Sequence, residues 1–174
     1  AQIAWWHYQH TLDLEFLRTY GWPLIKAVAE FYSAYLVEDK SSGKLCIPLS
    51  KTCEDTVFNS APDSRLVKNS LIDLAAFHAL IRDAAKAAQA LGLEEDASRY
   101  SELLTNMAEL PVSEGEFALA DKVLLDLPQS HPVTLSPIYP SEIVTAAGPE
   151  KLLPVARKTL ERLWRCSSRV TVGG

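Results

Sequence analysis

The sequence predicts a mainly α-helical protein with a few short β-strands in the connections between helices. Three observations lead to this fold class. Apolar residues recur every three or four positions over several long stretches, which is typical of amphipathic helices. These stretches come in pairs separated by Gly- or Pro-containing turns, and irregular segments separate the pairs. Antiparallel helix pairs joined by long loops are therefore expected.

The N-terminal part predicts a helical hairpin. Residues 3–10 and 13–20 show helical spacing, with Asp13 as N-cap and Gly21 as the residue that stops the helix. The clearest helix follows at 23–37 and has a proline in its first turn, where the missing N–H costs nothing.

A short strand and an irregular loop come next. Residues 41–43 mark a turn, and alternating apolar residues at 45–49 predict a strand that Pro48 confines to a sheet edge. The stretch 50–63 has no period. A connection of that length is more often functional than accidental.

A second helical hairpin is predicted after this loop. Its first helix runs from about residue 66 to residue 91 and ends at Gly92. The second helix begins with acidic residues at 94–96, where the helix dipole favours them, and Pro111 stops it.

Residues 112–140 are irregular apart from a short strand expected at 116–120. The last helix is predicted over 149–164, and Pro154 should kink it or shift its effective start. Residues 166–174 carry no helical period, so an unstructured tail is expected there.

Charge, hydropathy and cysteine content exclude several classes of function. The net charge is -5, from 17 Lys+Arg against 22 Asp+Glu, and there is no basic block, so we expect no nucleic-acid partner. No apolar run approaches the roughly 20 residues of a membrane span, so no membrane interaction is expected. The three cysteines form no CxxC pair, which leaves neither a metal site nor a disulfide framework indicated.

The loop SKTCEDTVFNSAPD places two carboxylates, Glu54 and Asp55, between a strand and a helix. A carboxyl group anchored at a cavity and partly desolvated has a raised pKa, as a general acid for glycosidic cleavage requires. The alternative is that both are solvated turn residues.

Other candidate residues are a loop histidine and aromatic rings. His131 lies in the second irregular segment and could hydrogen-bond a substrate, although a lone histidine is more often structural. Rings of Trp5, Trp6 and Tyr139 could stack on sugar C–H faces, although tryptophans at helical spacing are more often core residues.

Paired helices of this kind build both (α/α)6 toroids and helical-repeat scaffolds, and the pattern leaves both open. A closed toroid of six hairpins needs upwards of roughly 200 residues, at about 12 per helix and about 5 per connection. A chain of 174 residues is expected to form at most an incomplete (α/α)6 toroid.

Several segments together resemble glycoside hydrolase family 95, the α-L-fucosidase and α-L-galactosidase group. The run YQHTLDLEFLRTYGWPLIKAVAEFYSAYLVED is similar to a helical hairpin of that family, with Leu12 where Gly is usual. IPLSKTCEDTVFN is similar to the family's S-x-x-S-P-E-N-like loop. SHPVTLSPIYP resembles its HRHLSHLFGLYP segment, with Thr134 replacing one of the histidines.

The resemblance implies roles for particular residues. Glu54 corresponds to the family's general acid, although Cys53 replaces the usual Pro before it and Asp55 the usual Asn after it. The sugar-binding candidates are, with the aromatic residues above included, His131, Asp73, Trp5, Trp6, Asp55 and Tyr139.

The implied activity is inverting hydrolysis of terminal α-L-fucosyl or related linkages on an oligosaccharide or glycan, without a metal or organic cofactor. The expected organisation is a partial catalytic domain at 1–165 followed by the tail at 166–174. The family's water-positioning and downstream Asp phrases are not found in the chain, so the isolated chain is expected to be inactive. An extracellular or periplasmic location is implied by the resemblance alone.

Two alternatives remain. One is a non-catalytic helical scaffold that binds a protein or glycan, and the other is a different (α/α)6 glycosidase or phosphorylase. In an enzyme Glu54 should face a cleft, whereas in a scaffold it should lie on open surface. An unclosed ring of helices also exposes apolar helix faces, and we expect self-association through them.

Overall fold

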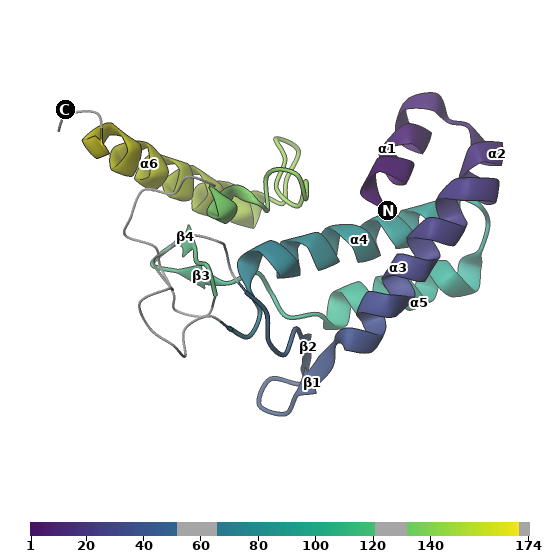
Figure 1. Ribbon diagram of the computed structural model, residues 1–174, viewed down its shortest axis with the longest axis horizontal. Helices are drawn as coiled ribbons and strands as arrows, with labels where there is room; N and C mark the ends of the chain where they lie inside the picture. Colours follow the sequence, from purple (N-terminus) through teal and green to yellow (C-terminus); the bar gives the residue numbers. More distant parts are fainter. Residues whose placement is uncertain (52–65, 121–131, 171–174) are drawn as a thin grey trace. The chain divides into compact units, whose positions relative to one another are not determined.

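The computed structural model describes residues 1–51, 66–120 and 132–170 (Figure 1). It is mainly helical with short antiparallel strand pairs, which confirms the coarse fold class. The chain divides into two compact units, the first formed by 1–46 with 77–107 and the second by 47–76 with 108–174. The incomplete (α/α)6 toroid stays a prediction.

The first unit opens with helical elements that confirm the predicted first hairpin in outline. At the start of the second element the Phe16 N–H donates to Asp13 Oδ1 at 2.9 Å, so the predicted N-cap is confirmed. The elements are α1 (Gln2–Thr11), α2 (Leu14–Phe16), the π-helical η1 (Leu17–Gly21) and α3 (Trp22–Tyr35).

Gly21 does not stop a helix, so that prediction is wrong. The Trp22 N–H donates to the Leu17 carbonyl oxygen, and this π-helical turn leads directly into α3. The proline at position 23 has no N–H for an ordinary helical bond, and the wider turn accommodates it. Gly21 is buried, and a Cβ there would lie 3.1 Å from Leu17 Cδ1, so close packing explains the glycine.

A hairpin of β1 (Val37–Asp39) and β2 (Lys44–Cys46) follows, with Gly43 at φ 68 in its turn. The predicted strand at 45–49 is therefore shorter and begins one residue earlier. Helix α4 (Leu71–Ala90) starts five residues after the predicted position. Ser70 caps the N-terminus of this helix, which explains the later start.

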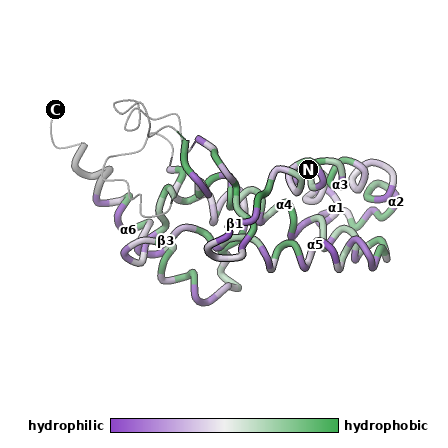
Figure 2. Tube along the Cα trace, turned by 90° about the horizontal axis from the view of Figure 1, so that it is seen from below, coloured by the Kyte–Doolittle hydropathy of each residue, from purple (hydrophilic) through white to green (hydrophobic). Residues whose placement is uncertain are grey.

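Helix α5 (Glu94–Asn106) completes the first unit and begins with the predicted acidic residues. Gly92 has a φ of 71° and ends α4 as predicted. Hydrophobic and hydrophilic residues alternate along α5 (Figure 2). Its apolar face buries Tyr100, whose ring makes an edge contact with Trp22 at 6.2 Å between centroids.

The second unit joins short elements to the last helix. A cluster of buried residues, Leu71, Phe117, Val144 and Ala156, forms its core. The elements are the N-terminal part of α4, β3 (Val112–Ser113), β4 (Glu116–Phe117), η3 (Val133–Leu135), η4 (Glu150–Leu152) and α6 (Leu153–Val170).

Helix α6 begins at Leu153, which places Pro154 in the first turn. Of the two effects predicted for this proline, the shifted start is confirmed. The helix runs to Val170, through residues where the sequence predicts a tail. Among the described helices none is both long and apolar enough to cross a bilayer.

Candidate active-site region

The loop predicted to carry the general acid has a closed base. Glu54 and Asp55 lie outside the described residues, but the chain on either side of them is described. Ser50 and Val67 form an antiparallel bridge, with N–H to O distances of 2.9 Å and 2.8 Å in the two directions. The bridge holds the two ends of the loop together.

A second pair of hydrogen bonds reinforces this base. The Asn69 N–H donates to the Ile47 carbonyl oxygen at 3.1 Å, and the Ile47 N–H donates to Asn69 Oδ1 at 2.9 Å. Asn69 has a φ of 54°, which Asn tolerates better than most residues. Sequence reasoning missed Asn69, and its place just before the helix is the only signal that could have drawn attention to it.

Ser70 caps α4 immediately afterwards and bonds Asp73. Ser70 Oγ donates to Asp73 Oδ2 at 3.0 Å, and the Asp73 N–H reaches Ser70 Oγ at 3.4 Å. Ser70 Oγ thus accepts from an N–H in the first turn of α4, as an N-cap serine does, while the Asp73 carboxylate accepts from the Ser70 hydroxyl. Ser70 is fully buried and Asp73 is half-buried. The Asp73 carboxylate is therefore bonded to the serine that caps α4, and its contact with a sugar stays a prediction.

The residues just before the second irregular segment bond the N-terminus of α4. The N–H of Leu71, the first residue of α4, donates to the Leu119 carbonyl oxygen at 2.8 Å. Leu71 and Phe117 also share the core of the unit. The segment 121–131, which includes His131, lies outside the described residues, but its preceding residues are joined to the end of the first loop.

Two buried hydroxyl groups follow the second segment. Thr134 and Ser136 are each 5% exposed, and their side-chain oxygens have no hydrogen-bond partner in the part of the chain that the structure describes. Unsatisfied buried hydroxyls are uncommon and often indicate a place for water or a ligand group. Tyr139 is 71% exposed, so its ring is available from solvent.

The two candidate tryptophans belong to the first unit. Trp5 is 6% exposed and its ring lies 5.4 Å from the Tyr8 ring, between centroids, as the core interpretation predicts. Trp6 is half-buried. Their roles in sugar binding stay predictions.

The first unit also has a polar cluster between α3 and α5. Lys26 Nζ lies 2.6 Å from Asp96 Oδ2, and Arg99 and Tyr100 both bond Glu30. The Arg99 hydrogen bond lowers the pKa of Glu30, and burial raises the pKa of the Tyr100 hydroxyl well above its usual range. Opposite charges are paired here, so the cluster joins the two helices.

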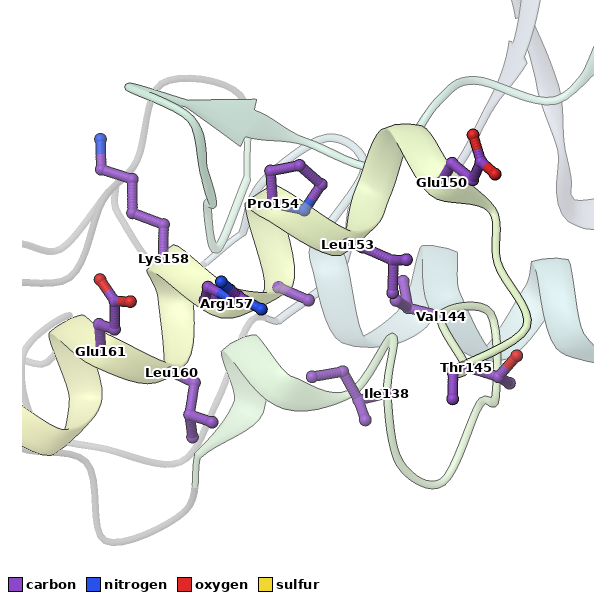
Figure 3. Close-up of a pocket in the computed structure, with 12 residues that line it drawn as sticks. Ile138, Val144, Thr145, Glu150, Leu153, Pro154, Arg157, Lys158, Leu160 and Glu161 are labelled. Atoms are coloured by element: carbon purple, nitrogen blue, oxygen red, sulfur yellow. The ribbon is translucent and has the colours of Figure 1, made fainter.

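A groove runs beside α6 in the second unit, with a volume of about 930 Å³. Apolar side chains meet between α6 and the preceding segment, and Lys158 and Glu161 of α6 also line the groove (Figure 3). The apolar lining includes Ile138, Val144, Leu153 and Leu160. The lining also includes polar and charged residues, among them Thr145, Glu150 and Arg157, so the groove presents both apolar and hydrogen-bonding groups.

No group of three or more His, Cys, Asp or Glu side chains that could hold a metal occurs within 1–51, 66–120 and 132–170. In chemical terms the second unit offers a rigid base for two loops, a capped helix start and buried hydroxyls.

Comparisons with known proteins identify the family. A search of curated proteins finds no match to the chain. Residues 1–170 match the family model described as the glycosyl hydrolase family 95 catalytic domain. That family is one of glycoside hydrolases, whose substrates are glycans. Because the match spans nearly all of the chain, the chain belongs to the catalytic-domain family of glycosyl hydrolase family 95.

Proposed function

We propose that this chain, with 1–165 as its catalytic-domain part, takes part in inverting hydrolysis of terminal α-L-fucosyl or closely related linkages. Family membership supports a glycoside hydrolase. The observation that carries the proposal is the common base of the two loops, where the Leu71 N–H bonds the Leu119 carbonyl at 2.8 Å. Glu54 and His131 belong to the segments that leave this base.

In the proposed mechanism Glu54 is the general acid. It donates its proton to the glycosidic oxygen while the C1–O bond breaks, and a water molecule activated by a base attacks the opposite face of the sugar ring. The proton ends on the departing sugar hydroxyl. Glu54 supplies the acid of the reaction, and no residue of this chain is proposed as the base that activates the water. The isolated chain is therefore expected to show no turnover of an aryl α-L-fucoside.

The sugar-binding candidates divide into two groups. His131, Asp55 and Tyr139 belong to the irregular segments, so we expect them to hydrogen-bond or stack on the sugar at the catalytic centre. Asp73 already accepts a hydrogen bond from Ser70, and Trp5 is mostly buried. We therefore expect Asp73, Trp5 and Trp6 to contribute less to binding.

The test is Glu54→Gln in the natural full-length protein, compared with Asp55→Asn, which makes the same carboxylate-to-amide change at a proposed sugar-binding residue and should therefore affect KM more than kcat. General acid catalysis contributes about 10²–10⁴ in rate, so Glu54→Gln should lower kcat by that factor on a fucosyl disaccharide. The loss should be much smaller on a nitrophenyl fucoside, whose leaving group needs little protonation.

Equal losses on both substrates, or no loss, would contradict the role of Glu54. Release of a sugar phosphate only when phosphate is supplied would favour a phosphorylase instead. Binding of glycan without turnover by the full-length protein would favour the scaffold.

A further inference from the structure

We propose that helix α6 pairs with α6 of a second copy of this chain, in the antiparallel direction and about a two-fold axis, through the groove beside it. Every residue that lines the groove lies within 138–161, which belongs to the second unit. The inference does not depend on the reaction proposed above, because it concerns a surface and not the residues assigned to catalysis.

Three large apolar side chains of α6 are open to solvent on one side of the helix. Leu153 is 37% exposed, Leu160 is 52% exposed and Trp164 is 76% exposed. Their spacings of seven and four residues along the sequence place them on one helical face. Ile138 and Val144 line the groove beside this face. An exposed apolar stripe next to a groove is typical of a contact surface.

Two charged residues belong to the same stripe. Arg157 and Glu161 are exposed, lie one helical turn apart and line the groove (Figure 3). Within the described ranges neither of them forms an ion pair, whereas Lys158 and Arg162 of the same helix are paired with Glu116 of β4. The two charges of the stripe are therefore available to a partner.

The order of residues along the stripe fits a second copy that runs in the opposite direction. From its N-terminal end the stripe reads apolar at Leu153, cationic at Arg157, anionic at Glu161 and apolar at Trp164. In an antiparallel pair centred near position 159, Arg157 of each copy lies opposite Glu161 of the other, and Leu153 lies beside Trp164. The two-fold axis makes each contact occur twice, as in most homodimers.

Other arrangements of the stripe are less favourable. A parallel pair would place Arg157 against Arg157 and Glu161 against Glu161, and like charges in contact weaken association. A purely apolar partner would desolvate both charges without pairing them, which costs free energy. Tryptophan and arginine are also among the residues that contribute most to protein interfaces. The charges therefore favour a second copy in the antiparallel orientation.

Charge reversal in the natural full-length protein tests this arrangement. Arg157→Glu places carboxylates opposite each other at both symmetric contacts, and Glu161→Arg does the same with guanidinium groups. Each variant alone should dimerise about 10-fold or more weakly than the wild-type protein in sedimentation velocity. An equimolar mixture of the two should recover most of the lost affinity, because a carboxylate of one chain then meets a guanidinium of the other at both contacts.

Mixing separates the contact between copies from effects within one helix. Arg157 and Glu161 are four residues apart, so each reversal also places like charges on neighbouring turns of α6. Adding the other variant does not remove that effect, since it is present within each chain. The matched controls are Arg18→Glu and Glu15→Arg, which make the same changes at an exposed ion pair of the first unit. They should leave association unchanged, both alone and mixed.

A wild-type protein that stays monomeric would overturn the proposal, and so would single reversals that associate as strongly as the wild type. A mixture that associates no better than its separate components would also overturn it. Equal weakening by the control pair would show an effect of net charge only and would reject the interface. A monomer whose affinity for a fucosyl disaccharide falls in Arg157→Glu would instead assign the groove to a glycan.

Discussion

Leu12 is the residue at which a single substitution should make the protein more stable. It ends α1 in the left-handed conformation, with φ 56° and ψ 23°, and its N–H donates to the Tyr8 carbonyl at 2.7 Å. The side chain is 71% exposed, so little packing depends on it. Leu12→Gly should keep the hydrogen bond and remove the backbone strain.

The size of the effect follows from two opposing contributions. A non-glycine residue in the left-handed region costs about 1–2 kcal/mol, and glycine loses about 0.5–1 kcal/mol more conformational free energy on folding than alanine. The net gain in the free energy of unfolding should be about 0.5–1 kcal/mol, or roughly 1–4 °C in Tm for a chain of this size.

Urea unfolding followed by tryptophan fluorescence measures this gain. Trp5, Trp6 and Trp22 all belong to the first unit, where Leu12 lies. The matched control is Leu12→Ala, which removes the exposed side chain but keeps the Cβ that causes the strain. If alanine stabilises as much as glycine, exposure of the leucine rather than its backbone conformation is responsible, and the reasoning is refuted.

Three further predictions concern other contacts. Thr159→Val removes the acceptor of the buried Phe117 N–H, 2.9 Å away, and should lower the free energy of unfolding by about 1–3 kcal/mol in urea. Arg99 lowers the pKa of Glu30, so their contact stabilises the fold above the unfolded pKa of about 4.3. This stabilisation is lost as the pH falls through the pKa of Glu30 in the folded state. Glu30→Gln should therefore reduce the acid-induced fall in the free energy of unfolding by less than about 1 kcal/mol. Leu160 is 52% exposed, and Leu160→Glu should reduce self-association in sedimentation velocity.

Each of these has its own control. Thr159→Ser keeps the hydroxyl and should lose less stability than Thr159→Val; an equal loss would show that packing, not the hydrogen bond, matters. A stability–pH curve unchanged by Glu30→Gln would show that the Arg99 contact contributes nothing measurable. A monomeric wild-type protein at high concentration would remove the basis for the Leu160 prediction.

Much of the helical structure could be read from the sequence because its signals are local. The spacing of apolar residues predicts α3 and α4, Asp13 caps as predicted, and Gly92 ends α4 with the expected positive φ. The prediction for Gly21 is wrong because glycine occurs both at helix ends and where close packing leaves no room for a Cβ. Only the contact with Leu17 distinguishes the two uses.

In the candidate site, too, the sequence identifies residues and the structure shows contacts. Residue types and the family resemblance single out Glu54, Asp55 and His131, and these lie outside the described residues. The structure adds the connections around them. It shows that the Asp73 carboxylate bonds the hydroxyl of Ser70 at the start of α4, and it places Trp5 among core residues.

The sequence by itself determined the helical fold class, the paired helices and the membership of a glycoside hydrolase family, because periodic spacing and ordered motifs are properties of neighbouring residues. The tertiary structure decided which chain segments share the base of the two loops. That base depends on bonds such as Ile47 to Asn69 and Leu71 to Leu119, whose partners are far apart along the chain. No local pattern encodes such pairings, since they form only when packing brings the partners together and excludes water from between them.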